Sequence, residues 1–447
     1  MKPRRKHARG CTMKKITIGM IGFGTVGTGV LKLLRGNAAV IRERLGAALT
    51  VKKIADLDIR RNRGIRVAPS LLTTDAKAIT DDPSIDLVVE LIGGIEPARA
   101  LLLRAIANGK PVVTANKALL AAHGIELLKA AHGKGVDIGF EGSVAGCIPI
   151  IRAIKEGLVA NRFSRILGIL NGTANYILTK MTNEGGNFQD ILKEAQECGY
   201  AERDPSLDIE GVDTAHKLAI LISLAYGTAV TFDRIYTEGI SHIEPLDIEF
   251  TRELGYKIKL LAIAREINGQ IEARVHPTLI PDDHLLSRVD GTYNAVFIDG
   301  DAAGPGMYYG KGAGMMPTAS AVVSDIIDLS RNMLRGTGQR VPPFSYQQEF
   351  IKKIIIKNIR EVVTRYYLRF SVLDRPGVLS KISGILGRRG ISIHSVIQKG
   401  RQTRGTVSIF LLTHQAREAS VRKALDEINR LSEVRARTML IRIEDDL

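Results

Sequence analysis

The order of apolar runs and polar turns in the first part of the chain predicts alternating strands and helices. Lys15–Ile21 has the character of a buried strand, and it runs through Gly22–Gly27 into a segment whose apolar residues recur at helical spacing. Further apolar runs predict strands of the same parallel sheet: Leu49–Ala55, Ile85–Leu91 and Pro111–Thr114. The pattern predicts an α/β domain of the Rossmann type over residues 14–142, completed by residues 305–340.

The middle of the chain, residues 143–304, predicts an α+β domain with a mixed sheet. From Gly211 a helical pattern begins, and the turns from Leu218 to Ala225 are almost entirely apolar, so we expect this helix to be buried on most sides. A mixed sheet with an exposed face commonly supports a dimer, and we expect a homodimer or a homotetramer. The other predicted elements are strands at Ser164–Leu170, Asp233–Thr237, Ile271–Leu279 and Ala295–Asp299 and a helix at Asn187–Gly199.

The C-terminal part of the chain predicts a small separate module. Residues 341–362 begin with Val341-Pro342-Pro343, are rich in Lys and Ile, and are interpreted as a linker. Residues 363–447 then predict strand, helix, strand, strand, helix and strand, which is the order of a ferredoxin-like fold.

The composition argues against two classes of partner. The net charge is +16, but residues 1–13 hold five cationic side chains and no acid, so we interpret them as a disordered basic extension. Lys and Arg are otherwise dispersed and the chain has no Trp, so we expect no nucleic-acid partner. No apolar run approaches the length of about 18 residues that a membrane span needs, so we expect no membrane association.

Cysteine is rare in this chain. Cys11, Cys147 and Cys198 form no CxxC pair and no zinc-binding spacing. This usage predicts a cytoplasmic protein without structural disulfides. We expect Cys147 and Cys198 to be buried as small apolar residues.

A glycine-rich turn directly follows the first strand and opens the first helix. In this context the spacing G-x-G-x-x-G predicts a dinucleotide site, because glycines let the backbone approach a pyrophosphate at the positive end of a helix. After the second strand, Asp56 suits the ribose hydroxyls of NAD, whereas Arg60, Arg61 and Arg63 suit the extra phosphate of NADP, and the choice stays open. The residues of the turn are Gly22, Phe23, Gly24, Thr25, Val26 and Gly27.

Two further positions are candidates for contact with the cofactor. Lys117 lies at the carboxyl end of a predicted parallel strand, where ligands bind in open α/β sheets, so it contacts substrate or cofactor or is an ordinary surface lysine. Residues 308–314 form a second glycine-rich stretch before a helix. We expect this stretch, with Gly310, to be a loop that lies against the cofactor as the chain returns to the first domain.

An acidic segment closes on a lysine in the middle domain. It holds Glu202, Asp204, Asp208, Glu210 and Asp213 within twelve residues. Asp213 and Lys217 are four residues apart on the predicted helix, so their side chains leave the same face. Such a pair is either a solvated surface contact or, at the mouth of a buried helix, a group able to move a proton to or from an alcohol oxygen.

Two loops at the ends of predicted strands are rich in polar or small residues. Asn171–Tyr176, which contains Gly172 and Thr173, offers polar groups to a substrate. Glu141–Pro149 leaves carbonyl groups beside one carboxylate, a ligand type that suits Na⁺ or K⁺, although a plain domain-crossing turn explains it equally well.

Taken together, these residues resemble those of the homoserine dehydrogenase family over nearly the whole chain. The most specific match is Gly199-Tyr200-x-Glu202-x-Asp204-Pro205-x-x-Asp208-Ile209-x-Gly211-x-Asp213-x-x-x-Lys217. Arg203 departs from the pattern, because the family usually has a small or apolar residue there. The resemblance implies NAD(P)-dependent interconversion of L-homoserine and L-aspartate 4-semialdehyde.

The resemblance also implies roles for individual residues. Lys217 would donate the proton to the substrate carbonyl, supported by Asp213 and Asp208. Lys117 and Glu202 would contact the substrate, together with Gly172, Thr173 and Tyr200. A monovalent cation would be held by Glu141 and the carbonyls of Val144, Gly146 and Ile148. Two alternatives stay open: a non-catalytic amino-acid sensor on the same scaffold, and a dehydrogenase of another small amino-aldehyde.

The C-terminal module resembles an ACT domain, with Asp374-Arg375-Pro376-Gly377 as the most characteristic piece. This resemblance implies an amino-acid effector, L-threonine in the first place, with Asp374 and Gly377 near the effector. The alternative is a module that only dimerises.

Overall fold

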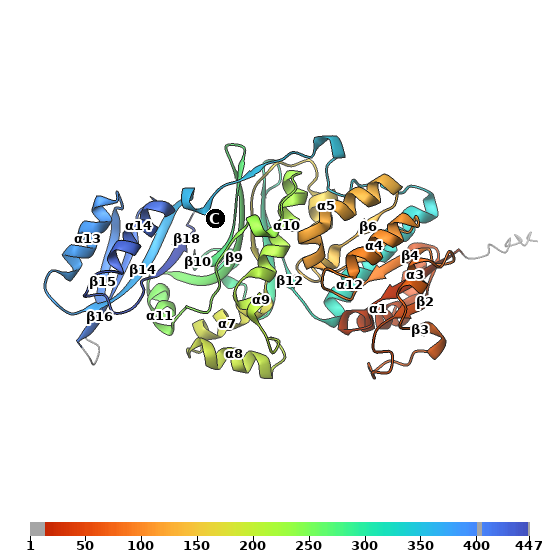
Figure 1. The fold of residues 1–447 in the computed structure, drawn as a ribbon, viewed down its shortest axis with the longest axis horizontal. Coiled ribbons are helices and arrows are strands. Elements are labelled where there is room, and N and C mark those ends of the chain that lie inside the picture. Colours follow the sequence, from red (N-terminus) through yellow and green to blue (C-terminus); the bar gives the residue numbers. More distant parts are fainter. Residues whose placement is uncertain (1–13, 400–404, 446–447) are drawn as a thin grey trace, which may run out of the picture. The chain divides into compact units, whose positions relative to one another are not determined.

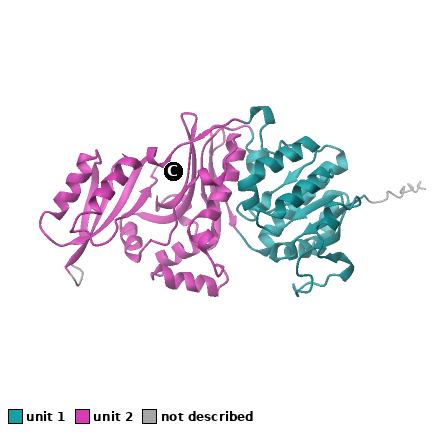
Figure 2. Cartoon of the chain, viewed as in Figure 1, with its two compact units in different colours: residues 1–159, 313–351 teal, residues 160–312, 352–447 magenta. Residues whose placement is uncertain are grey.

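The computed structural model describes residues 14–399 and 405–445 of the chain (Figure 1). The basic extension expected at residues 1–13 lies outside the described residues. The chain forms two compact units, each built from two separate segments (Figure 2). Unit 1 comprises the chain up to Val159 together with Ala313–Ile351, and unit 2 comprises Ala160–Gly312 together with the chain from Lys352 onward.

Unit 1 is built on a six-stranded parallel sheet with the order β3-β2-β1-β4-β5-β6. Because the order reverses between β1 and β4, the carboxyl ends of these strands form the expected ligand crevice. The prediction of a Rossmann-type domain is confirmed. The strands are β1 (Lys15–Ile21), β2 (Ala48–Ala55), β3 (Leu72–Thr73), β4 (Leu87–Glu90), β5 (Val112–Thr114) and β6 (Ile138–Gly139). The helices include α1 (Thr25–Gly36), α2 (Ala38–Leu45), α3 (Lys77–Thr80), α4 (Ala98–Ala107), α5 (Lys117–Lys134), α6 (Ile150–Arg152) and α12 (Met315–Arg335).

Helix α12 packs against α1 although it lies far along the sequence. Gly29 permits the close approach, since a Cβ at this position would lie 2.7 Å from the carbonyl oxygen of Met315. Val322 and Ile326 of α12 are buried in the same hydrophobic core as Ile18 of β1. Each fully buried aliphatic side chain of this kind contributes about 1.5–3 kcal/mol, so this packing secures the returning segment to the sheet.

Unit 2 is organised around a long antiparallel hairpin. β9 (Tyr256–Ile267) and β10 (Gln270–Pro281) are joined by Asn268 and Gly269, both of which have positive φ. Asn-Gly suits a two-residue turn of this kind, since both positions need positive φ. The sheet continues in the order β12-β11-β7-β9-β10-β18-β14-β16-β15. Its remaining strands before the C-terminal module are β7 (Phe163–Ile169), β8 (Tyr236–Thr237), β11 (Tyr293–Gly300) and β12 (Gly304–Lys311).

Helix α10 (Val212–Tyr226) is buried along most of its length, as its apolar pattern predicts. Every side chain from Asp213 to Ile222 is buried, including the charged ones. The acidic segment before it contains one short helix, α9 (Ser206–Ile209). The other helices of this part are α7 (Gly172–Asn183), α8 (Phe188–Glu197) and α11 (Pro245–Glu253).

The C-terminal module has the predicted ferredoxin-like order of elements. Its last strand, β18 (Met439–Ile443), also pairs in parallel with β10, with Thr278 opposite Arg442 and Leu279 opposite Ile443. The module therefore continues the sheet of unit 2. Its other elements are β14 (Val363–Leu373), α13 (Val378–Arg388), β15 (Ile393–Lys399), β16 (Thr406–Thr413) and α14 (Glu418–Ile428), with a two-residue strand β17 (Ala416–Arg417).

The structure corrects several expectations. Tyr308–Lys311, with Gly310, was expected to be a loop, but these residues lie in β12, paired with β11 in unit 2. Residues 305–312 therefore do not complete the Rossmann-type domain, because backbone pairing to β11 holds them in the mixed sheet. Residues 143–159 lie in unit 1 and not in the middle domain. Cys147 and Cys198 are exposed and not buried.

The described helices contain no segment long and apolar enough to cross a membrane. In the expected strand Asp233–Thr237, residues Phe232–Arg234 form a short 3₁₀ turn, and only Tyr236 and Thr237 are strand.

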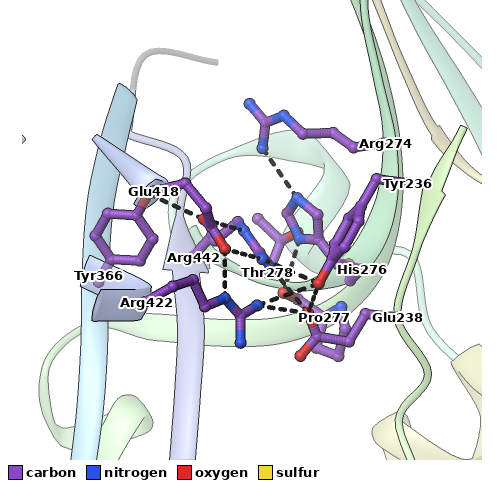
Figure 3. A network of polar contacts seen from close by, with 10 residues as sticks. All are labelled: Tyr236, Glu238, Arg274, His276, Pro277, Thr278, Tyr366, Glu418, Arg422 and Arg442. Carbon is purple, nitrogen blue, oxygen red and sulfur yellow. Dashed lines mark hydrogen bonds and ion pairs between the residues drawn. The ribbon is translucent and has the colours of Figure 1, made fainter. Parts of the chain in front are cut away.

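A cluster of buried polar groups lies where β18 meets β10 (Figure 3). His276 of β10 is fully buried, and its Nε2 lies 2.9 Å from a guanidinium nitrogen of Arg274. Its Nδ1 lies 3.0 Å from the carbonyl oxygen of Pro277. Since guanidinium nitrogens only donate, Nε2 accepts and the ring is neutral, with its proton on Nδ1.

We expect the free energy of unfolding to decrease as the pH falls below about 6.5, the ordinary pKa of histidine. Burial, and after it the charges of Arg442, Arg274 and Arg422, hold the pKa of His276 well below its ordinary value. The unfolded chain therefore takes up a proton in this range while the folded protein does not. Denaturation curves over a pH series should show a weaker dependence in His276→Gln than in the unmodified chain. Equal pH dependence in both proteins would contradict this role.

Candidate active site

The glycine-rich turn of unit 1 has the geometry of a pyrophosphate cradle. Gly22 has φ of 104°, and a Cβ on it would lie 2.6 Å from the carbonyl group of Leu91. A Cβ on Gly27 would lie 2.3 Å from the carbonyl oxygen of Gly22, so this glycine allows α1 to approach the strand end. Gly24, directly before α1, has no atom within 4 Å of its Cβ position. The open space at a helix N-terminus fits a dinucleotide phosphate.

Asp56 and Arg63 lie together beside this turn. One Asp56 carboxylate oxygen accepts the Phe23 N–H at 2.7 Å, and the other accepts from Arg63 at 3.0 Å. The Arg63 guanidinium lies 4.9 Å from the centre of the Phe23 ring. The expected acid and one of the expected arginines are thus neighbours, so groups suited to a ribose and to a phosphate lie at the same strand end. Arg60 and Arg61 are exposed.

The carboxyl ends of β4 and β5 hold a buried carboxyl group. Glu90 accepts the Thr114 hydroxyl at 2.6 Å and the Ile92 N–H at 2.8 Å. Burial raises the pKa of Glu90 above its ordinary value, against the effect of these hydrogen bonds. Asn116 caps α5 and donates to the carbonyl oxygen of Gly94 at 2.6 Å. Lys117, half-buried, is the first residue of that helix, so it lies at the ligand-binding edge where the sequence placed it.

The loop after β6 holds Glu141 in a buried position. Its two carboxylate oxygens accept the N–H groups of Ile151 and Arg152 at 2.8 and 3.0 Å. The loop turns through Ala145 and Gly146, both with positive φ. The carbonyl oxygen of Ile148 accepts from the Ile150 N–H at 2.8 Å, which leaves that oxygen a second lone pair. The donor set is one carboxylate and backbone carbonyls, which suits a hard monovalent cation.

A second acid lies against Glu141. Asp325 of α12 accepts the Glu141 N–H at 2.8 Å. Burial, and then the neighbouring Glu141 charge, raise the pKa of Asp325 to about 7. Burial likewise raises the pKa of Glu141. A small cavity of about 50 Å³ borders both residues together with Lys155.

In unit 2, Lys217 and Asp213 form a buried pair on α10. The Lys217 Nζ donates to Asp213 at 2.7 Å and to the carbonyl oxygen of Leu170 at 2.6 Å. The two residues are 7% and 4% exposed, which excludes the solvated surface pair that the spacing alone permits. A buried ammonium needs such partners, because desolvation without them would drive off its proton.

Asn171 connects this pair to the acidic segment. Its side-chain amide donates to Asp208 at 2.6 Å and to Asp213 at 2.9 Å, and its carbonyl accepts from the Ala174 N–H as the cap of α7. The Thr173 hydroxyl lies 2.7 Å from the carbonyl oxygen of Tyr200 and 3.2 Å from Asp208. The structure therefore brings together Lys217, Asp213, Asp208, Thr173 and the backbone of Tyr200.

The other expected substrate residues are at the margin of this cluster. The side chain of Glu202 is exposed, and so is that of Arg203. The Tyr200 ring lies 4.9 Å from the ring of Tyr176. Gly172 has no room for a side chain, since a Cβ would lie 2.9 Å from the carbonyl oxygen of Thr292.

Sequence reasoning did not assign Asn171 a role of its own, although it is the residue that joins both acids. The available signal was a polar residue directly before a helix, which indicates a cap. The second role, as donor to two carboxylates, depends on the meeting of α7, α9 and α10 and is visible only in the structure. Glu90 and Asp325 were missed for the same reason.

Comparison with known proteins identifies the family. Models of the homoserine dehydrogenase domain and of the homoserine dehydrogenase NAD-binding domain match residues 149–327 and 22–141, and an ACT domain model matches residues 366–433. A homoserine dehydrogenase of Pseudomonas aeruginosa is 46% identical over 97% of this chain and 99% of its own length. The chain belongs to the homoserine dehydrogenase family. It is an oxidoreductase that interconverts L-homoserine and L-aspartate 4-semialdehyde with NAD(P).

Other relatives of the homoserine dehydrogenase family agree. The Bacillus subtilis homoserine dehydrogenase is 40% identical over 97% of this chain and 99% of its own length. A solved homoserine dehydrogenase of Thiobacillus denitrificans is 49% identical with a TM-score of 0.91, covering 97% of this chain and 99% of that one. A hyperthermophilic archaeal homoserine dehydrogenase, solved in complex with NADPH, is 27% identical with a TM-score of 0.61, covering 71% of this chain and 98% of that one. The expected fold class, activity, NAD(P) cofactor and ACT domain are confirmed.

We expect Asn171→Ala to raise KM for homoserine by about tenfold or more, since two carboxylates lose the amide that both accept from. Steady-state kinetics measure this change. Asn187→Ala is the matched control: Asn187 caps α8 in the same way, accepting from the Asp190 N–H, but its amide donates only to Asp190. Similar kinetics in the two variants would mean that Asn171 acts only as a helix cap.

Proposed function

We propose that Lys217 exchanges the proton with the substrate oxygen in the homoserine dehydrogenase reaction. The observation that supports this role is the buried ammonium of Lys217, oriented by Asp213 and the Leu170 carbonyl at the start of an acidic, helix-rich site. Bound NAD(P)H supplies the hydride for reduction of the aldehyde. As negative charge develops on the aldehyde oxygen, Lys217 donates a proton to it. In the direction of homoserine oxidation, the same amine accepts the hydroxyl proton.

The neighbouring residues bind and orient the substrate in this proposal. The substrate carries an ammonium and a carboxylate. Asp208 and Glu202 are carboxylates suited to the ammonium, and Lys117 suits the carboxylate. Asp213 holds Lys217 in position, and Asn171 holds Asp213 and Asp208, so substrate binding requires little rearrangement.

We expect Lys217→Ala to reduce kcat by about 10²–10⁴-fold, the range for loss of a general acid or base. Because the glycine-rich turn is in unit 1, binding of NADPH, measured by its fluorescence, should be unchanged. Lys180→Ala is the matched control, since Lys180 of α7 pairs with Glu184 and Glu194 near the surface. Turnover of Lys217→Ala within about twofold of the unmodified chain would refute the assigned role.

The proposal for cofactor choice concerns Arg63. Its guanidinium lies beside the turn that receives the cofactor, where it pairs with Asp56 and donates to the carbonyl oxygens of Phe23, Arg61 and Asp58. In this proposal it exchanges some of these partners for the 2′-phosphate when NADP binds. Without Arg63, Asp56 is released to accept ribose hydroxyls.

We therefore expect Arg63→Ala to increase KM for NADP by more than KM for NAD, which parallel assays with both cofactors measure. Arg61→Ala provides the comparison, because this exposed arginine is another candidate for the phosphate contact. A larger change in Arg61→Ala than in Arg63→Ala would assign the phosphate contact to Arg61.

Three further proposals follow from the sequence, and the first two of them rest on the family resemblance. Glu141, with the carbonyls of Val144, Gly146 and Ile148, holds Na⁺ or K⁺. The ACT domain binds an amino-acid effector, L-threonine in the first place, near Asp374 and Gly377; Gly377 has φ of 88° and precedes α13. The chain forms a homodimer or a homotetramer, which a mixed sheet with an exposed face commonly supports.

A further inference from the structure

The residues that follow β8 form hydrogen bonds with the acidic segment. The Ile240 N–H donates to the carbonyl oxygen of Ile209 at 2.9 Å, and the Ser241 hydroxyl donates to Glu210 at 2.9 Å. These bonds hold the end of α9, directly after Asp208. Residues 209–211 connect Asp208 to α10, which carries Asp213 and Lys217.

Gly239 makes this contact tight. A Cβ on Gly239 would lie 2.6 Å from the carbonyl oxygen of Ile209 and 2.7 Å from the Cα of Glu210. Both are backbone atoms, which cannot move aside as a flexible side chain could. A displacement of Gly239 toward the acidic segment would therefore displace the end of α9 as well.

The residue before Gly239 is held by the ACT domain (Figure 3). Arg442 of β18 donates to Glu238 at 3.0 Å, and Arg422 of α14 lies 3.5 Å from the same oxygen. The hydroxyl of Tyr236 donates to that oxygen at 2.7 Å and accepts from Arg422 at 3.1 Å.

Within the ACT domain this contact has a rigid support. Arg442 is fully buried and donates to both carboxylate oxygens of Glu418 at 2.9 and 2.6 Å. Arg422 donates to Glu418 as well, at 2.8 Å, and the Tyr366 hydroxyl does so at 3.0 Å. The bidentate contact between Arg442 and Glu418 defines both the distance and the orientation of the guanidinium.

We propose that Glu238 is a positioning residue through which the ACT domain sets the position of the acidic segment. The path runs from Arg442 and Arg422 to Glu238, and through Gly239–Ser241 to the end of α9. A movement of α14 or β18 would change the Glu238 contact and shift Asp208 relative to Lys217. The inference deepens the proposed function and rests on it, because it assumes that Asp208 binds substrate.

The first experiment tests the contact with the acidic segment. We expect Gly239→Ala to raise KM for homoserine by about tenfold or more, with the dissociation constant of NADPH unchanged, since the cofactor turn lies in unit 1. Gly306→Ala is the matched control, because the nearest atom to its Cβ position is 4.0 Å away. Ser241→Ala removes only the hydroxyl that donates to Glu210, and it provides the test if Gly239→Ala does not yield folded protein. Unmodified KM values in the folded variants overturn the proposal.

The second experiment tests the connection to the ACT domain. Arg422→Gln and Glu238→Gln should each raise KM for homoserine, and the double variant should be no worse than the more affected single variant, because both interrupt one path. Arg388→Gln is the control, since Arg388 pairs with Glu427 on the surface of the same domain. Additive effects, or an unchanged KM in Arg422→Gln, overturn the connection.

These outcomes separate the inference from the proposed function. If Lys217→Ala keeps its turnover, the proposed function fails whatever the other variants show. If Lys217→Ala is inactive while Gly239→Ala, Ser241→Ala and Arg422→Gln are unaffected, only the positioning role of Glu238 fails.

Discussion

The buried ion pair between Lys217 and Asp213 constrains how the surrounding elements of unit 2 pack. Two charges withdrawn from water lose several kcal/mol of hydration each, and a buried pair keeps its charge only with good geometry and further hydrogen bonds. Those bonds come from other elements: the carbonyl of Leu170 at the end of β7 and the amide of Asn171 at the start of α7. The end of β7 and the helices α7 and α10 must therefore meet at one point for the Lys217–Asp213 pair to have these partners.

Unit 1 uses the same principle at the carboxyl ends of its strands. Glu90, the last residue of β4, is satisfied by the Thr114 hydroxyl and by the N–H groups of Ile92 and Gly93 in the turn that follows. Asp56, after β2, is satisfied by the Phe23 N–H and by Arg63. Both carboxylates at the ligand edge are thus held by neighbouring segments of unit 1 before any ligand arrives. Such preorganisation reduces the reorganisation that binding and reaction require.

Much of the fold could be predicted from the sequence, because local patterns encode it directly. The strand before Gly22, the apolar helix after Gly211 and the order of elements in the ACT domain all follow from spacing and turn residues. The central strand β9 was missed, since it carries Lys259, which reads as a surface residue. In the structure Lys259 is 2% exposed and donates to the carbonyl of Val289 and to Asp290. Partners so distant in sequence leave no local pattern.

In the candidate site, too, local sequence patterns predict some features, whereas others depend on tertiary packing. The spacing of Asp213 and Lys217 predicts a shared helix face, but the choice between a solvated and a buried pair depends on packing around α10. The resemblance to the family selected Asp208 and Thr173, and the structure places the two side chains 3.2 Å apart. It also selected Glu202, whose side chain is exposed, and its contact with substrate stays a prediction.

The pairing of β18 with β10 has a consequence for the order in which the chain folds. Arg442 and Glu238 are 204 positions apart, yet each helps to satisfy the other. Contacts between such distant residues form late, because a long loop must close before they contribute stability. During synthesis on the ribosome, the hairpin of β9 and β10 is complete well before β18 emerges, and its β10 edge stays without that neighbour. Until then, the buried arginine Arg274 lacks its partner Glu444, which follows β18. The sheet of unit 2 is therefore complete only when the ACT domain has been translated.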